Sequence, residues 1–156
     1  MKRLSFVLLA FCMVLAIFTG CAQKTKPAEY DLAALATKLQ DSGAFSDFLS
    51  PITKEIAASF YGFEDADVTD CVVYCSTGAT TEEIALFKCA NEAAATKIKA
   101  NADKRIETQK AIYESYAPAE PPKLDDAIVK QDGLYVFYIV SADTSKAQAV
   151  LDGLNK

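Results

Sequence analysis

The longest run of helical periodicity in the chain lies between Asn91 and Tyr116. At 3.6 residues per turn, one face of this segment is apolar and the others carry charged side chains. The apolar face comprises Ala95, Ile98, Ala102, Ile106, Ile112, Tyr113 and Tyr116. Asn91 is a favourable N-cap, and Pro118, Pro121 and Pro122 prevent the helix from continuing. The pattern predicts one long helix that packs on a core and leaves one face in water.

Two shorter helices are predicted before it. Asp31 is the expected N-cap of the first, which ends before Gly43 and has an apolar face of Leu32, Leu35, Ala36 and Leu39. The second is predicted to start at Ser50, an N-cap followed by a proline suited to the first turn, and to end before Gly62.

The periodicity then changes to that of β-strands. Residues 71–76 and 83–89 are rich in β-branched, aromatic and apolar side chains, and a turn containing Gly78 separates them. A second hairpin is predicted from 127–131 and 134–140, because Asp132 and Gly133 form the dipeptide that a two-residue type I′ turn favours. The strand 134–140 is apolar on both alternations, so we expect it inside the sheet.

A final helix is predicted after Asp143, with Ala147, Val150, Leu151 and Leu154 on one stripe. The element order predicts an α+β fold: two hairpins form an antiparallel four-stranded sheet and are joined by the long helix, with N-terminal and C-terminal helices packed on the sheet. A helix of 25 residues is about 37 Å long and a seven-residue strand about 23 Å, so one end of the long helix should overhang the sheet.

The first twenty residues have the pattern of an export signal. Lys2 and Arg3 precede an uninterrupted apolar run, 6–18, which ends in Thr19, Gly20 and Cys21. This ending resembles the lipobox of bacterial lipoproteins, with Phe18 in place of the usual aliphatic residue. The alternative is an uncleaved membrane anchor, but the run is shorter than the roughly 20 residues that a spanning helix needs.

The lipobox pattern predicts that Cys21 carries diacylglycerol and a palmitate-type acyl chain and becomes the mature N-terminus. Residues 1–20 are then a signal peptide, 21–29 the lipidated N-terminus and a tether, and 30–156 a single globular domain. Fully extended, the tether reaches roughly 25 to 30 Å. We therefore expect the domain on the extracytoplasmic face of the cell membrane.

Charge narrows the choice of partners. Removing the signal takes away two positive charges and no negative ones, so the formal charge changes from -5 to -7. An acidic domain is repelled by anionic lipids, and no basic stripe is present for nucleic acid. The expected partners are the membrane, through the lipid, and an unknown protein or small molecule.

The chain contains no histidine and no tryptophan. Ser-His-Asp and Cys-His nucleophile systems, histidine general bases and histidine-ligated zinc are therefore excluded. No glycine-rich phosphate loop is present. We predict no catalytic residues, no metal and no cofactor apart from the lipid.

Three cysteines remain in the expected mature domain besides Cys21. In an extended strand Cys71 and Cys75 lie about 13 Å apart, too far for a disulfide. A register that pairs Ser76 with Glu83 brings Cys71 close to Cys89, which makes this pair a candidate disulfide in an exported protein. The alternative is that all three are small buried apolar residues.

Acidic clusters are the next candidates for chemistry. Asp65, Asp67 and Asp70 lack the glycine and distal glutamate of a calcium loop and are interpreted as a solvated turn. Glu82 and Glu83 are interpreted as charges that flank a strand.

The candidate ligand-binding residues lie on the long helix. Arg105 and Gln109 interrupt its apolar stripe one turn apart, where an arginine and an adjacent amide can hold the carboxylate of a ligand. The alternative is that Arg105 covers apolar surface with its stem and pairs with an acid of its own domain. Tyr113 and Tyr116 are expected beside them, and Tyr135 is a candidate third member of an aromatic patch.

The lipoprotein signal, the segments 83–88 and 105–109, and the hairpin around Gly133 together resemble the exported bacterial family called domain of unknown function 4358. Tyr116 with Pro118, and Tyr135 with Val136, belong to the same likeness. The resemblance covers roughly residues 30–154 and implies fold and location, but no activity.

The sequence thus favours a lipid-anchored extracytoplasmic domain that binds a partner or acts as an accessory module at the cell surface. The alternative is a histidine-independent enzyme that uses carboxylates, with Arg105 as the substrate anchor. That alternative requires a pocket that contains Arg105 and an acid with a shifted pKa.

Overall fold

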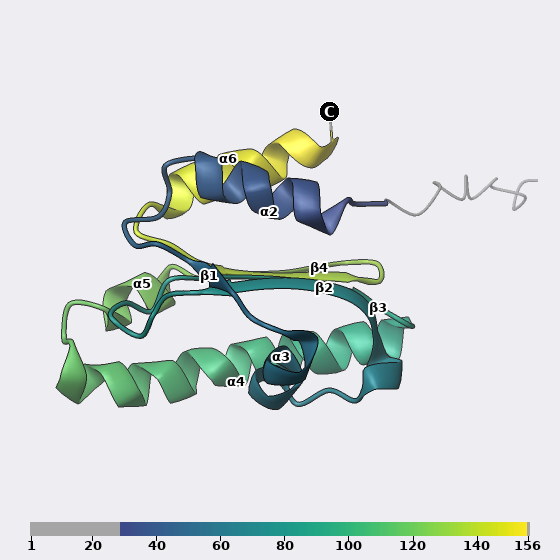
Figure 1. Cartoon of the computed structure of the whole chain (residues 1–156), viewed down its shortest axis with the longest axis horizontal. Coiled ribbons are helices and arrows are strands. Elements are labelled where there is room, and N and C mark those ends of the chain that lie inside the picture. The colour runs from purple at the N-terminus through teal and green to yellow at the C-terminus, as the bar shows by residue number, and fades with distance from the viewer. Residues whose placement is uncertain (1–28, 156) are drawn as a thin grey trace, which may run out of the picture.

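A five-stranded antiparallel sheet separates two layers of helices in the structure, a computed structural model that describes residues 29–155 (Figure 1). One face is covered by α2 (Leu32–Asp41) and α6 (Thr144–Asp152). The other face is covered by α3 (Lys54–Tyr61), α4 (Glu92–Tyr116) and α5 (Pro121–Asp125). The predicted signal peptide and Cys21 lie outside the described residues.

The strands run in the order β1-β2-β3-β5-β4, and every neighbouring pair is antiparallel. Their bounds are β1 Ser50–Pro51, β2 Val68–Cys75, β3 Glu83–Cys89, β4 Ile128–Asp132 and β5 Tyr135–Val140. Two short 3₁₀ turns, Asp65–Asp67 and Gly153–Asn155, complete the described elements. The α+β class and the single long helix are confirmed, whereas the prediction of four strands was wrong.

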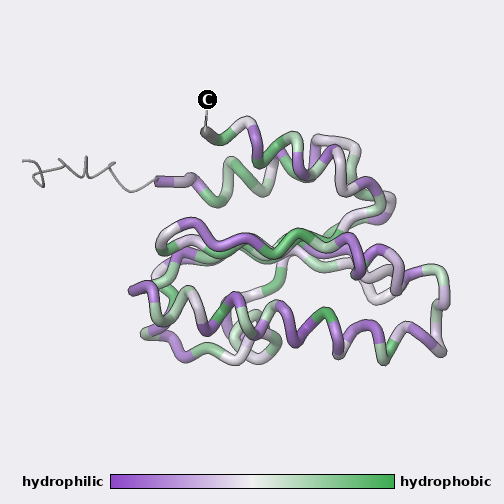
Figure 2. The backbone as a smooth tube through the Cα atoms, turned by 180° about the vertical axis from the view of Figure 1, so that it is seen from behind, coloured by the Kyte–Doolittle hydropathy of each residue, from purple (hydrophilic) through white to green (hydrophobic). Residues whose placement is uncertain are grey.

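The central strands β3 and β5 supply both cores, since alternate side chains of a strand point to opposite faces. Toward α4 they direct Ala85, Phe87, Val136, Tyr138 and Val140. Toward α2 and α6 they direct Ile84, Leu86, Tyr135, Phe137 and Ile139. Every residue of β5 is buried, so the expectation of an inner strand is confirmed. Figure 2 shows the hydrophobic stretch of these strands between helices of mixed polarity.

The additional strand lies where a helix start was predicted. Ser50 pairs with Cys75 and Pro51 with Tyr74, and α3 begins only after Thr53, whose side chain accepts a hydrogen bond from the Ile56 N–H. A residue before proline is biased toward extended conformations, and an edge strand tolerates a proline that has no N–H to donate. The same dipeptide that suits a helix N-terminus therefore also suits this edge.

Three other boundaries differ from the predictions. β2 begins at Val68, three residues earlier than expected, and α5 forms within a segment that was predicted to be a loop. The β4–β5 turn consists of Gly133 and Leu134, because Asp132 is still paired with Tyr135. Gly133 has a φ of +57° while Leu134 has a negative φ, so the signs fit a type II′ turn and not type I′.

The long helix α4 begins as predicted, with the Asn91 side chain accepting a hydrogen bond from the Ala94 N–H at 2.9 Å. Ile98 and Ala102 are fully buried, but Ile112 is 54% exposed and Tyr116 70% exposed. The predicted apolar stripe is therefore wrong at its C-terminal end. The reason is geometric, since α4 extends past the ends of the strands (Figure 1).

The first described residues are held at the β4–β5 turn. The Tyr30 hydroxyl donates a hydrogen bond to Asp132 Oδ2 at 2.5 Å, and its ring packs edge-on against Tyr135 and Phe137. Burial and this carboxylate raise the pKa of Tyr30 to about 12. Lys88 pairs with Glu29 at 3.0 Å. We call this end of the sheet the proximal end.

Four connecting segments gather at the opposite end of the sheet (Figure 1). They are residues 41–49, which begin with the last residue of α2, residues 76–82, residues 117–127, which include α5, and residues 141–143, and we call them together the distal end. Within residues 29–155, no helix combines the length and the apolar character needed to cross a membrane.

The two-sided core predicts a large difference between two phenylalanines. Phe137→Ala should lower the free energy of unfolding by about 3 to 5 kcal/mol, because it leaves a cavity at a fully buried site. Phe48→Ala is the matched control, since Phe48 is 75% exposed, and should change stability by less than about 0.5 kcal/mol. Urea denaturation followed by circular dichroism measures both, and equal losses would contradict the packing described.

Candidate functional site

Two consecutive glutamates, Glu82 and Glu83, are buried where β3 begins. Both flank the start of β3 as interpreted from the sequence, but they are buried and not solvated. Each carboxylate is paired with a different cation, Glu83 with Arg105 of α4 and Glu82 with Lys123 of α5. These two pairs organise the candidate site.

Glu83 and Arg105 form a forked ion pair. Arg105 Nε lies 2.9 Å and Nη2 lies 2.8 Å from Glu83 Oε2, and the Tyr61 hydroxyl donates to Glu83 Oε1 at 2.6 Å. The guanidinium carbon of Arg105 also lies 4.4 Å from the centre of the Phe60 ring, within range of a cation–π contact. Of the two alternatives for Arg105, the structure therefore shows pairing within its own domain.

The predicted ligand-binding residues are brought together only in part. Arg105, Gln109 and Tyr113 line one side of a groove of about 330 Å³, which is also lined by Ile52, Phe60 and Cys75. Tyr116 is not among its lining residues, and its ring packs edge-to-face with that of Tyr113, with centroids 5.9 Å apart. The Tyr113 hydroxyl donates to the Gly78 and Thr80 carbonyls.

Tyr135 lies elsewhere. It faces the α2 and α6 side of the sheet, next to Tyr30 at the proximal end, so it forms no patch with Tyr113 and Tyr116.

Four ionisable groups near this groove have raised pKa values. Burial, followed by the charge of Glu83, raises the pKa of the Cys75 thiol, so the thiol stays protonated. Burial raises the pKa of Tyr61 and of Tyr138 as well. Burial opposes the charge on Arg105, but Glu83 outweighs it and the pKa of Arg105 is raised. These groups are therefore not poised to exchange a proton near pH 7.

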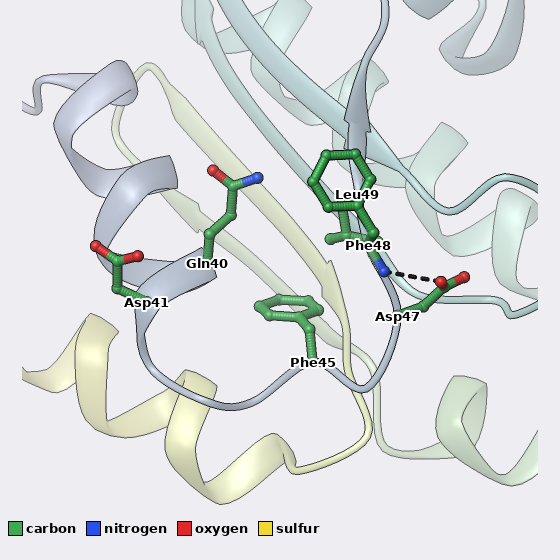
Figure 3. A pocket seen from close by; sticks show the side chains of 6 residues that line it. All are labelled: Gln40, Asp41, Phe45, Asp47, Phe48 and Leu49. Atoms are coloured by element: carbon green, nitrogen blue, oxygen red, sulfur yellow. Dashed lines mark hydrogen bonds between the residues drawn. The ribbon is translucent and has the colours of Figure 1, made fainter.

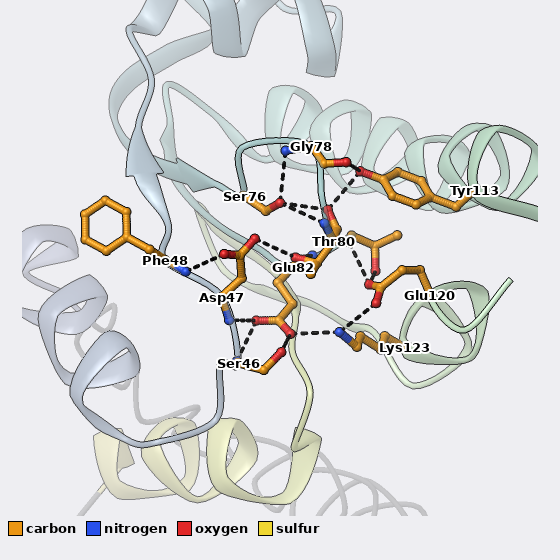
Figure 4. A network of polar contacts seen from close by, with 11 residues as sticks. Ser46, Asp47, Phe48, Ser76, Gly78, Thr80, Glu82, Tyr113, Glu120 and Lys123 are labelled. Carbon is orange, nitrogen blue, oxygen red and sulfur yellow. Dashed lines mark hydrogen bonds and ion pairs between the residues drawn. The ribbon is translucent and has the colours of Figure 1, made fainter. Parts of the chain in front are cut away.

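Glu82 is the centre of a second network, at the distal end (Figure 4). Its carboxylate accepts hydrogen bonds from Ser46 N at 2.8 Å, from Asp47 N at 3.1 Å and from the Ser46 hydroxyl. Lys123 Nζ lies 2.9 Å from Glu82 and 3.0 Å from Glu120. One buried glutamate thus holds a loop on one side and a helix on the other.

The network extends to all four distal segments. Glu120 accepts from Thr81 N at 2.9 Å, which ties 117–127 to 76–82. The Thr80 hydroxyl donates to Asp47 Oδ2 at 3.2 Å, and Asp143 N donates to Ala44 O at 2.9 Å, which joins 141–143 to 41–49. The distal end is therefore a set of segments held by buried and partly buried polar contacts as well as by apolar packing.

The candidate disulfide is not formed. β2 and β3 pair Cys71 with Phe87 and Cys89 with Val68, so the two cysteines are not cross-strand partners. Cys71, Cys75 and Cys89 are free thiols in the structure. The predicted register was off by one residue, and a bulge between Val68 and Asp70 shifts Cys89 further from Cys71.

The aspartates before β2 serve a turn. Asp67 accepts from Glu64 N at 3.0 Å and pairs with Lys97, while Asp65 pairs with Lys54. In the part of the chain that the structure describes, no cluster of three or more potential metal-ligating side chains is present.

A family model described as domain of unknown function (DUF4358) matches residues 42–141, well over half of the chain. The chain belongs to this family. Searches of curated proteins and of solved structures returned no match. The segment that matches DUF4358 contains all five strands, the α4 face and most of the distal end, whereas α2 and α6 lie outside it.

Sequence reasoning found Arg105 in this DUF4358 domain because a cation within an apolar stripe implies a buried partner. It missed Glu82, Glu120 and Lys123, since short charged segments between elements carry no periodicity that separates buried from exposed side chains.

The Glu83–Arg105 pair gives the first prediction for this site. Arg105→Met should cost about 3 to 5 kcal/mol of stability, because it leaves a buried carboxylate without its cation. The double variant Glu83→Leu/Arg105→Met should cost clearly less than the two single changes added together. Lys99→Ala breaks the exposed pair with Asp103 and, as a control, should cost less than about 0.5 kcal/mol. Additive losses in denaturant titrations would show that the pair is not coupled.

The Glu82 network gives a pH-dependent prediction. Burial favours the protonated carboxyl, but the hydrogen bonds from Lys123, Ser46 and Asp47 outweigh it and hold the pKa of Glu82 below its ordinary 4.5. A carboxylate whose pKa is lower in the folded than in the unfolded state stabilises the fold at pH values above its unfolded-state pKa. This stabilisation is lost as the pH falls through its folded-state pKa.

Glu82→Gln should therefore destabilise the protein by about 1 to 3 kcal/mol at pH 7. The gap between wild type and variant should narrow as pH falls below 4.5, the ordinary value. Thermal melts across this pH range test it, and a constant gap would exclude Glu82 as the titrating group.

Proposed function

We propose that this protein is a lipid-anchored extracytoplasmic binding module that presents its distal end to a partner at the cell surface. The observation that carries the proposal is the arrangement of the two ends. Tyr30 holds the start of the domain at the β4–β5 turn, and the loops gather at the opposite end of the sheet (Figure 1). A lipid on Cys21 would place the membrane on the proximal side and leave the loops facing away from it.

The electrostatics of the chain support a domain that is held off the membrane surface. The formal charge of -7 after removal of the signal opposes adsorption to anionic lipids. The tether, 21–29, allows a stand-off of up to roughly 25 to 30 Å. A rigid domain held away from the bilayer is suited to contact with another macromolecule.

The binding function is preferred over the carboxylate enzyme because of the state of the site. Arg105 already holds the carboxylate of Glu83 with two of its nitrogens and is covered by Phe60, so it does not offer an open anchor to a substrate. Glu82 has a lowered pKa and is occupied by Lys123 and Ser46, which does not suit a general acid at neutral pH.

The anchor is tested through Cys21. Cys21→Ala should move the protein from the membrane pellet to the soluble fraction, because the acylated side chain is lost. Mass spectrometry of the wild-type protein should find a lipid-modified N-terminus at Cys21. An unprocessed N-terminus, or a wild-type protein in the cytosol, would contradict the proposal.

The orientation is tested by photocrosslinking in intact cells. A photoreactive amino acid in place of Phe48, at the distal end, should give a discrete protein adduct. The same amino acid in place of the exposed Asp70, near the proximal end, should give lipid adducts or none. Identical adducts from both positions would contradict a distal binding face.

A further inference from the structure

The distal end is strongly acidic. Its four segments contain seven carboxylates, Asp41, Asp47, Glu82, Glu120, Asp125, Asp126 and Asp143, and a single basic residue, Lys123. Lys110 and Lys146 from the flanking helices pair with Asp125 and Asp143. Glu82 and Glu120 share the single positive charge of Lys123, whereas Asp41 and Asp126 are exposed and have no ion-pair partner among the described residues. A negative field therefore faces solvent here.

An aromatic side chain projects from this acidic end. Phe48 is 75% exposed, the largest exposure of any large apolar residue in the described chain. Its backbone N–H donates to Asp47 Oδ1 at 2.7 Å, and Glu82 holds the two preceding residues. The buried carboxylate of Glu82 therefore fixes the backbone of the loop next to Phe48, although most of the Phe48 side chain is not packed in the fold.

A hollow of about 320 Å³ lies beside Phe48. Figure 3 shows the Phe45 ring between Gln40 and Phe48, and the Asp47 carboxylate accepting the hydrogen bond from the Phe48 N–H. The hollow is thus lined by two aromatic rings, one leucine and one amide, with the carboxylates of Asp47 and, on the α2 side, Asp41. Such a site accepts an apolar side chain and places a carboxylate next to it.

A second hollow, of about 460 Å³, lies between the segments 117–127 and 141–143. It is lined by Lys123, Asp126, Ser141, Asp143 and Thr144, among others. The Ser141 hydroxyl is buried and has no hydrogen-bond partner in the described part of the chain. The Asp143 N–H bond to Ala44 O connects this hollow to the Phe48 loop. A buried hydroxyl without a partner is a rarity that a bound polar group would relieve.

We propose that the distal end docks a basic segment of a protein partner, in which an apolar side chain inserts beside Phe48 while neighbouring lysines or arginines face Asp41 and Asp126. This rests on the proposed function and names its partner chemistry. Aromatic residues held in place by a rigid loop lose little freedom on binding and dominate interface energies. The acidic rim adds steering and selects a cationic partner.

The same charges disfavour the other occupants. A second copy of the chain would bring two acidic ends together, and an anionic lipid surface would meet the same repulsion. The lipid surface is also expected at the opposite end of the sheet, where Tyr30 holds the start of the domain.

The test selects phage-displayed random peptides on the purified full-length protein in detergent micelles, which does not depend on lipidation. Selected peptides should combine an aromatic or aliphatic residue with several lysines or arginines. Binding of a selected peptide should weaken by about tenfold or more in Phe48→Ala and by about three- to tenfold in Asp41→Asn/Asp126→Asn. Raising the salt concentration from about 50 to 500 mM should weaken it further.

The control variant Asp65→Asn/Asp70→Asn makes the same change of charge near the proximal end and should leave peptide binding unchanged. Selection of neutral or acidic peptides, or binding that is indifferent to Phe48→Ala, would overturn the inference. A dimer in native mass spectrometry that Phe48→Ala dissolves would overturn it in favour of a second copy. Because none of these measurements uses Cys21, their failure is separate from a failure of the membrane anchor.

Discussion

The burial of two adjacent carboxylates at the start of β3 is the constraint on which the rest of the structure depends. Taking a carboxylate out of water costs several kcal/mol unless a cation and further donors replace the water. Glu83 is satisfied by Arg105 and Tyr61, so the middle of α4 and the end of α3 must meet at one point of the sheet. Glu82, the residue before it, is satisfied by Lys123 and Ser46, so the segments 117–127 and 41–49 must meet at Glu82.

These two sites divide the molecule by role. The Glu83 site lies on the α4 face and holds two helices on the sheet. The Glu82 site lies at the distal end and holds a surface that carries exposed carboxylates and Phe48.

The two edges of the sheet are protected from pairing with another strand in different ways. Pro51 on β1 has no N–H to donate, and Lys130 lies in the middle of β4. Both features discourage pairing of an edge with another strand.

Most elements were predictable because their signals are local. Asp31, Asn91 and Asp143 cap the helices that they were expected to cap, and β3 has its predicted bounds. Errors arose where one local pattern suits two structures. Ser50 and Pro51 fit both a helix start and an edge strand, and the Gly133 turn moved by one residue because strand pairing continued through Asp132.

The sequence by itself determined the order of the two hairpins and the four longer helices, the inner position of β5, the presence of a long helix that extends past the sheet, and the absence of imidazole chemistry. Tertiary structure alone decided which charges are buried. Glu82, Glu120 and Lys123 come from segments up to 41 residues apart and acquire their roles only when the loops meet. The physical reason is that apolar periodicity is a property of one continuous segment of sequence, whereas the solvation of a charge depends on every element that packs around it.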